Sequence, residues 1–505
     1  MKLFWILGIS FSLAALSACS SGSHSSTEPE ETGNGSSSSV SLKDIDDILN
    51  SSASKDKDTP KSSAIVEVDE NGFKRSGCDL KSDENTLKAL DLINERAFNL
   101  FEAFSKKRMN EAKSISAEVK PLYKKVLDKN PRNCNAQLGY AVAIVADLAN
   151  NKTLRDLYND YDFWFNKRGV ESLQDFTKMI TELSVNKSFT KTAQSALENE
   201  VLPAVDSAIT FMQYIMDQGG YVLNIRDGGY IREMDNSEFG LALSGLFATK
   251  AAINIAISMN LEIDDNGDYS WINNLDGLSI GEEAPTSNQK KALVKIVNLI
   301  GLNGTFSTIY TKKQKEWKSV PSLVDSALVE ARDAFKYSLD ESMTPGSQEN
   351  DLYVVGKGAD ADISISDIMD IIENLNKGIQ ASRGPYKVSV NGKEIVVNGR
   401  KYFENVEGIQ KFLPYYKFNG SDLGTFYFTD KSGANPVPLL DFLDGTLSFP
   451  KDGEGKIIFR DPTFGGVFPE FTQKDIWELL DHDDEDSAPC VEICNSISGC
   501  YLSCP

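Results

Sequence analysis

Four cysteines lie close together near the C-terminal end of the chain, in the sequence CVEICNSISGCYLSC. Cys490, Cys494, Cys500 and Cys504 follow the spacing C-x3-C-x5-C-x3-C. This spacing differs from the C-x2-C pairs of zinc sites and from the C-x-x-C motif of thiol oxidoreductases. Because thiols stay reduced in the cytosol and pair in oxidising compartments, the location of the protein decides what these four can do.

The first 18 residues have the composition of an export leader, with one positive charge before an apolar run too short to span a bilayer comfortably. The sequence LSAC at positions 16–19 then resembles the lipobox of bacterial lipoproteins. The resemblance implies that Cys19 is lipidated and becomes the mature N-terminus, and that Ser20 directs the protein to the outer membrane. An ordinary secretory peptide is the alternative, and it would leave Cys19 unmodified in the same compartment.

Export determines how the other cysteines are interpreted. The chain has seven cysteines, so an even number is left once Cys19 is set aside, as expected for disulfides. Cys78 and Cys134 flank an expected helical hairpin and are predicted to pair. The four near the C-terminus are predicted to form two further bridges, and the sequence leaves the pairing open. A four-thiolate zinc or iron site is the alternative.

Charge and composition exclude several classes of function. The chain has 505 residues, 41% of them hydrophobic, which suffices for two or three domains with cores of their own. A net charge of −22 argues against nucleic acid as a partner. The only two histidines, His24 and His482, lie in polar stretches, which excludes sites that need a rigid imidazole. We expect no cofactor and favour a role other than catalysis.

The chain divides into a polar tether and a helical body. Residues 19–81 are polar and Ser-rich, which predicts a flexible tether with an end-to-end distance of about 45 Å. From 82 to 342 the apolar spacing is helical. There, Tyr123, Val126 and the sequence LGY at 138–140 resemble parts of successive tetratricopeptide-repeat helices. The resemblance implies a helical-repeat-like array of antiparallel helices, an architecture that usually binds partners.

One apolar stretch within the helical body could cross a membrane. Residues 239–259 carry a single charge, Lys250. The pattern Asp235-x-x-Glu238 before them is typical of a capping box at a helix start. Lys250 would lie in mid-bilayer without a named partner, so we favour a buried central helix.

The residues after this helix are similar in part to a calcium loop. Glu262, Asp264 and Asn266 occupy positions 1, 3 and 5 of an EF-hand-type loop, and Asp268 adds another carboxylate. Position 12 is Asn273, which cannot supply the bidentate carboxylate of Glu. A surface turn rich in Asp, Asn and Gly explains the composition equally well, so no metal site is assigned.

The C-terminal part mixes helical and strand patterns. Residues 343–480 are predicted to form a smaller α+β domain with a hairpin around Asn391-Gly392, and 481–505 an acidic spacer and disulfide-rich tail. The predicted fold class is therefore mainly α, with a smaller C-terminal α+β domain. Apolar spacing further predicts helices at 288–300, 322–339 and 364–376.

An aromatic loop in this part is a candidate binding element. The sequence RDPTFGGVFPEF at 460–471 concentrates Phe464, Phe468 and Phe471 among prolines and glycines. Such a loop can stack on sugar rings or grip a partner. It can also pack beneath its own domain as a hydrophobic plug, which is the interpretation that we favour.

These patterns predict a lipid-anchored envelope lipoprotein, held to the outer membrane by its anchor, that acts as a binding or scaffold module. The expected partner is another envelope protein or a polysaccharide. A carboxylate-based glycan hydrolase is one alternative, and it would need two carboxylates about 5 to 9.5 Å apart in an aromatic groove. A helical-repeat periplasmic partner of a transporter is the other, and it would need an enclosed apolar site for a small ligand.

Overall fold

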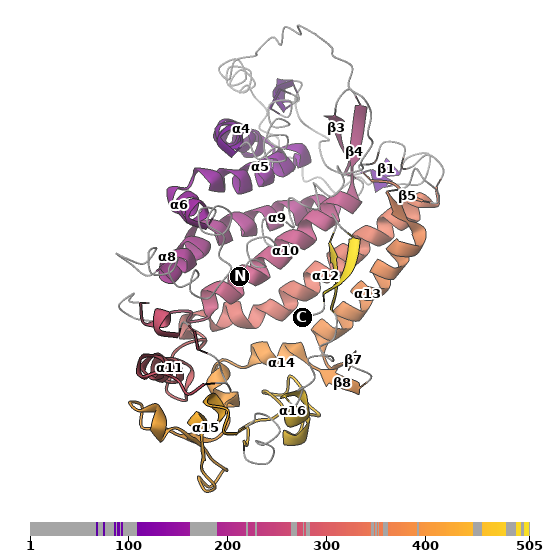
Figure 1. Ribbon diagram of the computed structural model, residues 1–505. Coiled ribbons are helices and arrows are strands. Elements are labelled where there is room, and N and C mark those ends of the chain that lie inside the picture. Colours follow the sequence, from indigo (N-terminus) through magenta and orange to yellow (C-terminus); the bar gives the residue numbers. More distant parts are fainter. Residues whose placement is uncertain are drawn as a thin grey trace, which may run out of the picture. The chain divides into compact units, whose positions relative to one another are not determined.

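A computed structural model describes most of the chain from position 109 onward (Figure 1). The predicted leader, most of the predicted tether, and Cys19 and Cys78 lie outside the described residues. Those that are described are 67–68, 74–75, 85–86, 88–90, 92–93, 109–161, 189–218, 221–227, 230–263, 270–275, 277–278, 283–344, 348, 351, 353–356, 362–390, 393–447, 457–480, 491–495 and 499–503.

The chain forms two compact units, each assembled from stretches that are separate in sequence. Unit 1 contains Met1–Asp156, Ala196–Ile253 and Leu323–Ile379. Unit 2 contains Leu157–Ser195, Asn254–Ser322 and Gln380–Pro505.

The described residues are mostly helical, which confirms the prediction of a mainly α fold. The α-helices are α4 (Met109–Lys129), α5 (Cys134–Asp147), α6 (Lys152–Tyr161), α8 (Phe189–Ala196), α9 (Leu202–Gln218), α10 (Asn236–Ser258), α11 (Ser287–Ile300), α12 (Gln314–Ser342), α13 (Ile365–Arg383), α14 (Gly399–Glu404), α15 (Leu439–Leu443) and α16 (Gln473–Leu480). Short helices of other types are η1 (Leu148–Asn150), η3 (Leu197–Val201), η4 (Ser270–Leu275), η5 (Thr311–Lys313), η6 (Ile409–Phe412) and η7 (Leu423–Thr425).

The strands form small sheets of two or three members. They are β1 (Glu67–Val68), β2 (Lys74–Arg75), β3 (Leu223–Asp227), β4 (Tyr230–Met234), β5 (Val355–Gly356), β6 (Ile363–Ser364), β7 (Tyr386–Val390), β8 (Lys393–Val397), β9 (Tyr416–Lys417), β10 (Tyr427–Phe428), β11 (Val437–Pro438), β12 (Val491–Asn495) and β13 (Gly499–Ser503). The three-stranded sheet has the order β11-β10-β9, and the parallel pair is β5 with β6.

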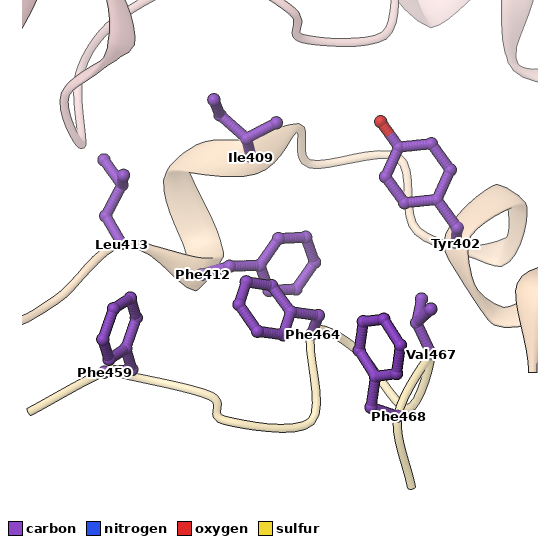
Figure 2. Close-up of a pocket in the computed structure, with 8 residues that line it drawn as sticks. All are labelled: Tyr402, Ile409, Phe412, Leu413, Phe459, Phe464, Val467 and Phe468. Carbon is purple, nitrogen blue, oxygen red and sulfur yellow. The ribbon is translucent and has the colours of Figure 1, made fainter. Parts of the chain in front are cut away.

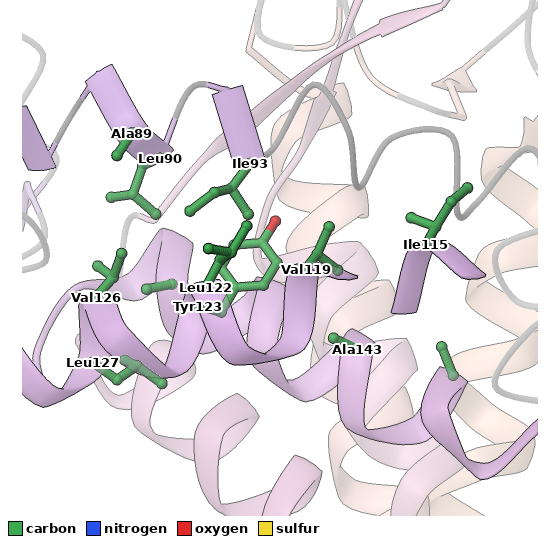
Figure 3. Packing of buried hydrophobic residues seen from close by; sticks show 12 residues of the cluster. Ala89, Leu90, Ile93, Ile115, Val119, Leu122, Tyr123, Val126, Leu127 and Ala143 are labelled. Carbon is green, nitrogen blue, oxygen red and sulfur yellow. The ribbon is translucent and has the colours of Figure 1, made fainter. Parts of the chain in front are cut away.

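The first helical hairpin of unit 1 depends on a close approach between α4 and α5. Asn133 caps α5, since its side-chain oxygen accepts a hydrogen bond of 2.9 Å from the amide of Ala136. Gly139 lets the buried ring of Tyr123 lie directly against the α5 backbone, because a Cβ there would come within 2.1 Å of the ring. Around Tyr123 lies an aliphatic cluster that includes Ile93 and Val119 (Figure 3).

The later helices of unit 1 pack against one another in chain order. Phe211 of α9 makes an edge contact with Tyr140 of α5 at 5.6 Å between ring centroids. Lys250 of α10 forms an ion pair of 2.6 Å with Asp206 of α9. Gly240 of α10 faces α12, and the adjacent α12 and α13 share a cluster with Tyr353, Val355 and Ile368 at its centre.

The helix α10 contains the apolar stretch that could be a membrane span. By its length and composition this helix could cross a membrane, but 56% of its most apolar 18-residue stretch is buried inside the structure. Phe239 and Leu243 are fully or almost fully buried, and Lys250 has a carboxylate partner in Asp206. This burial is typical of a core helix.

Unit 2 has several small aromatic cores. Trp317 of α12 packs against Tyr402 and Phe403 of α14, and its indole N–H donates a 2.9 Å hydrogen bond to the carbonyl of Asn405. A second core joins β7 and β8 to α16, with Ile395 at its centre.

Several local predictions are confirmed with shifted boundaries. The hairpin at Asn391-Gly392 joins antiparallel β7 and β8, with Val390 opposite Lys393. The helix predicted at 288–300 is α11, which begins with a capping box between Thr286 and Gln289. The other two predicted helices are both longer than expected, as α12 and α13.

Gly139→Ala is predicted to destabilise the protein by about 1–2 kcal/mol. Overpacking against the Tyr123 ring costs about 1–3 kcal/mol, which outweighs the gain of up to about 1 kcal/mol in helix propensity. Urea unfolding followed by circular dichroism measures the change in the midpoint.

Gly378→Ala is the matched control, because it is also a helical glycine of unit 1. A Cβ at this position meets Leu328 of α12 at 3.4 Å, which is an ordinary contact. We expect this variant to be stabilised by up to about 1 kcal/mol. Equal effects of the two substitutions would show that Tyr123 does not need the space at Gly139.

Candidate functional site

Unit 2 contains an apolar pocket of about 340 Å³, here called the aromatic pocket (Figure 2). Tyr402 comes from α14, and Ile409 and Phe412 come from η6. Leu413 directly follows η6, and the other lining residues come from the segment 459–468, which precedes α16. Figure 2 shows the rings of Phe412, Phe464 and Phe468 near one another in the middle of the view, between Phe459 on the left and Tyr402 on the right. The lining consists of Tyr402, Ile409, Phe412, Leu413, Phe459, Phe464, Val467 and Phe468.

The loop that supplies Phe464 is closed by the carboxylate of Asp461. Its Oδ1 accepts hydrogen bonds from the Thr463 amide at 2.9 Å and the Thr463 hydroxyl at 2.6 Å. Its Oδ2 accepts a bond of 2.7 Å from the amide of Gly465. Burial alone would raise the pKa of Asp461, but these donors outweigh it and lower the pKa. The loop therefore keeps its closing charge at neutral pH.

Three successive residues of this loop have left-handed backbone conformations. Phe464 has a φ of 48°, followed by Gly465 at 72° and Gly466 at 85°. Glycine takes such values freely, whereas a bulky side chain is held there only when its surroundings impose it. The hydrogen bonds to Asp461 supply that constraint. The strained turn directs Phe464 into the pocket wall.

The three phenylalanines of the candidate binding loop have different surroundings. Phe464 and Phe468 line the pocket and lie 6.0 Å apart, edge to face. Phe471 is 8% exposed and belongs to the core with Ile395 and Ile476. It also stacks on Phe468 at 4.7 Å. The loop is thus anchored beneath its own unit through Phe471 and presents the other two rings to the pocket.

The chemistry of the aromatic pocket is that of a binding site for an apolar group. The lining consists of aromatic and aliphatic side chains, and the hydroxyl of Tyr402 is the single polar side-chain group among them. Burial raises the pKa of Tyr402, so this hydroxyl stays neutral at physiological pH. Burial of apolar surface is the main driving force for binding to such a wall.

A second candidate lies in unit 1, where several carboxyl groups gather; we call Glu233, Asp235, Glu238, Glu341 and Asp351 the carboxyl cluster. Asp235 precedes α10, and its amide donates to Glu238 Oε2 at 2.9 Å, as the capping-box pattern predicts. Glu233 and Asp351 lie opposite each other in an isolated β-bridge. From α12, Glu341 is within hydrogen-bonding reach of Asp235.

Burial and mutual repulsion raise the pKa values of Glu233, Glu238, Glu341 and Asp351. Burial acts first on Glu341, and the nearby charge of Asp235 adds to it. The same causes raise the pKa of Asp351 from 3.8 to about 7, and burial raises that of Glu238. Tyr337 is in hydrogen-bonding contact with Asp235 and Glu341. The arrangement retains protons at pH values where exposed carboxyl groups have lost them.

Metal binding has no geometric support in the part of the chain that the structure describes. No three Asp, Glu, Cys or His side chains are grouped there in a way that could hold an ion. Glu262, the first residue of the calcium-like loop, is buried and lies 3.6 Å from the ammonium of Lys191. Asp264, Asn266 and Asp268 lie outside the described residues.

The cysteines are described only in part. Cys134 is fully buried at the start of α5 and is disulfide-bonded. Its predicted partner, Cys78, lies outside the described residues, as do Cys490 and Cys504. Cys494 and Cys500 occupy opposite positions in strands β12 and β13.

Sequence reasoning found only part of the aromatic pocket. Tyr402 and the residues of η6 are not predicted as part of a site, because aromatic residues such as those in FLPYYKF at 412–418 pack into a core as readily as they line a pocket. The pattern Asp461-x-Thr463 followed by two glycines is the signal for the closed loop, since such short polar residues bond their own backbone. The carboxyl cluster joins segments far apart in the chain, which no spacing reveals.

Comparisons with protein-family models, with curated proteins and with solved structures found no match to this chain.

The carboxyl cluster predicts that stability falls as the pH rises from about 4 to 9. In this window the folded state holds protons that the unfolded carboxyl groups have released, with Asp351 losing its proton at about 7 instead of 3.8. Urea midpoints at pH 5, 7 and 9 measure the slope, and Glu341→Gln is expected to make it shallower.

Glu373→Gln is the control for this prediction. Glu373 is an exposed residue of α13, and its ion pair with Lys377 lowers its pKa. Its removal is expected to leave the fall in stability above pH 5 unchanged. A midpoint that rises with pH, or an equal response of the two variants, would contradict the assignment.

Proposed function

We propose that this protein is a lipid-anchored envelope lipoprotein that acts as a binding module for another envelope protein. The observation that carries the proposal is the composition of the aromatic pocket, whose wall is apolar except for one hydroxyl. An apolar side chain projecting from the partner would fill it. The surrounding surface of both proteins would then supply specificity.

The chemistry of the pocket favours a protein partner over a polysaccharide. Sugars bind through rings that stack on aromatic faces together with many hydrogen bonds to their hydroxyl groups, and Tyr402 alone cannot supply these. Leucine, phenylalanine and tryptophan side chains need no such partners. The volume, about 340 Å³, is near the lower end of the usual range for small-molecule sites, about 300–1,000 Å³, and suits one inserted group.

The arrangement of the chain supports a role in presentation at a membrane. The sequence LSAC ending at Cys19 is the proposed anchor, and the polar stretch to position 81 is the proposed tether. We propose that the helices of unit 1 form a helical-repeat-like array, which the packing of successive helices in chain order supports. A disulfide-rich tail completes the proposed organisation.

Neither alternative function has a comparable observation in its favour. No Asp or Glu is among the residues that line the aromatic pocket. A glycan hydrolase needs two carboxyl groups flanking the bound sugar. A partner of a transporter would take up a small apolar ligand in the same pocket, and the experiment below separates that case from a protein partner.

Site-specific photocrosslinking tests the proposed function. A benzoylphenylalanine in place of Ile409, in the pocket wall, is expected to crosslink to a protein in the native envelope. The same probe in place of the exposed Lys431 of unit 2 is the control. Filling the pocket with Val467→Trp should reduce the adduct about tenfold, because the inserted anchor group carries most of the binding energy.

Two outcomes would overturn the proposal. One is an adduct yield at Ile409 no higher than at Lys431, in protein whose near-ultraviolet circular dichroism shows native packing. The other is glycan cleavage by the purified chain that a single Asp or Glu substitution abolishes.

The anchor gives a separate prediction. Cys19→Ser is expected to move the protein from the membrane fraction to the soluble periplasmic fraction, because no thiol remains to be acylated. Intact-mass analysis of the wild-type chain should show a lipid adduct on a mature form that begins at Cys19. A wild-type chain that is already soluble and unmodified would contradict the anchor and leave the pocket unaffected.

A further inference from the structure

The C-terminal hairpin brings two cysteines of the tail directly opposite each other. Strands β12 and β13 are antiparallel, and their register runs from Val491 opposite Ser503 to Asn495 opposite Gly499. Cys494 is opposite Cys500 in this register. The hairpin is the pair of yellow arrows in Figure 1.

This placement meets the distance requirement for a disulfide. Opposed residues of an antiparallel pair have Cα atoms about 4.5 or 5.5 Å apart, depending on the type of pair. Disulfides join Cα atoms that are about 4.4–6.8 Å apart, so either type is suitable. By contrast, residues four positions apart along a strand are separated by about 13 Å, which is too far.

We propose that Cys494 and Cys500 form a disulfide across the β12–β13 hairpin. Of the three ways in which the four tail cysteines can pair among themselves, this bond leaves only one, with Cys490 joined to Cys504. The spacing of the sequence agrees with it, since each of these two lies four residues beyond the central pair. The tail would then contain two nested bridges.

The stability of the hairpin gives a reason for this bond. An isolated two-stranded hairpin is marginally stable in water, and each of these strands has five residues. Small segments without a large core are commonly held by disulfides in oxidising compartments. The inference relies on the proposed export for the oxidising compartment, and it is independent of what fills the aromatic pocket.

The covalent step is a two-electron oxidation. Two thiols lose two protons and two electrons and form one S–S bond. The electrons reduce the disulfide of a thiol oxidoreductase to a dithiol by thiol–disulfide exchange, through a mixed disulfide on one of the two cysteines. Each of the two bridges therefore requires the reduction of one oxidoreductase disulfide.

Peptide mapping of the full chain without reduction tests the pairing, because the sequence offers cleavage sites between the cysteines. Cleavage after Glu492 and after Tyr501 releases the peptide 493–501, which contains Cys494 and Cys500. The proposed bond makes this a separate peptide that is two hydrogens lighter than its reduced form. Each of the other two pairings within the tail would instead leave three fragments joined together.

Two samples make the outcome specific. One is protein isolated from cells with its thiols trapped by alkylation, and the other is the full chain reduced and then reoxidised in a glutathione buffer. The bridged 493–501 peptide is expected in both. If only the reoxidised chain contains it, the pairing stands and the proposed export is wrong.

A single substitution gives an independent readout. In Cys494→Ser, alkylation is expected to label one new thiol, at Cys500, and Cys490 should stay protected. Cys134→Ser is the control and should leave the 493–501 peptide unchanged. Joined fragments from the reoxidised chain, labelling of Cys490 in Cys494→Ser, or four tail thiols that bind zinc stoichiometrically would overturn the proposal.

Discussion

The carboxylate of Asp461 accepts hydrogen bonds from Thr463 and Gly465, and the wall of the aromatic pocket depends on them. A phenylalanine with a φ of 48° is strained by about 1–3 kcal/mol, so it keeps that conformation only where other contacts impose it. The donors of the loop satisfy a half-buried charge and fix the turn at the same time. Phe464 and Phe468 then line the pocket, while Phe471 anchors the loop in the core.

The two units show how the number of donors decides the state of a buried carboxyl group. Burial raises the pKa in both places, yet Asp461 is surrounded by N–H and O–H groups and its pKa falls. Glu341 and Asp351 face other carboxyl groups, and their pKa values rise. Unit 2 therefore uses a carboxylate as a permanent structural charge, whereas unit 1 contains groups that gain and lose protons near neutral pH.

Sequence patterns predicted the local elements of this protein better than its assembly. The turn residues Asn391-Gly392 and the capping pair Asp235 and Glu238 act within a few positions, so spacing alone identified them. The pocket could be anticipated only at Phe464 and Phe468, because Tyr402 and η6 reach it through tertiary packing. The spacing of the tail cysteines leaves their pairing open, and only the register of β12 and β13 shows that Cys494 lies opposite Cys500.

Calorimetric titration with indole tests the central claim, that the aromatic pocket accepts an apolar group, most directly. Indole is small enough for a volume of about 340 Å³ and is almost entirely apolar, like the wall of the pocket. The account predicts saturable binding to the full chain with a negative heat-capacity change, and its loss when Val467→Trp fills the pocket. Absence of binding, or binding of equal strength to the filled variant, would contradict it.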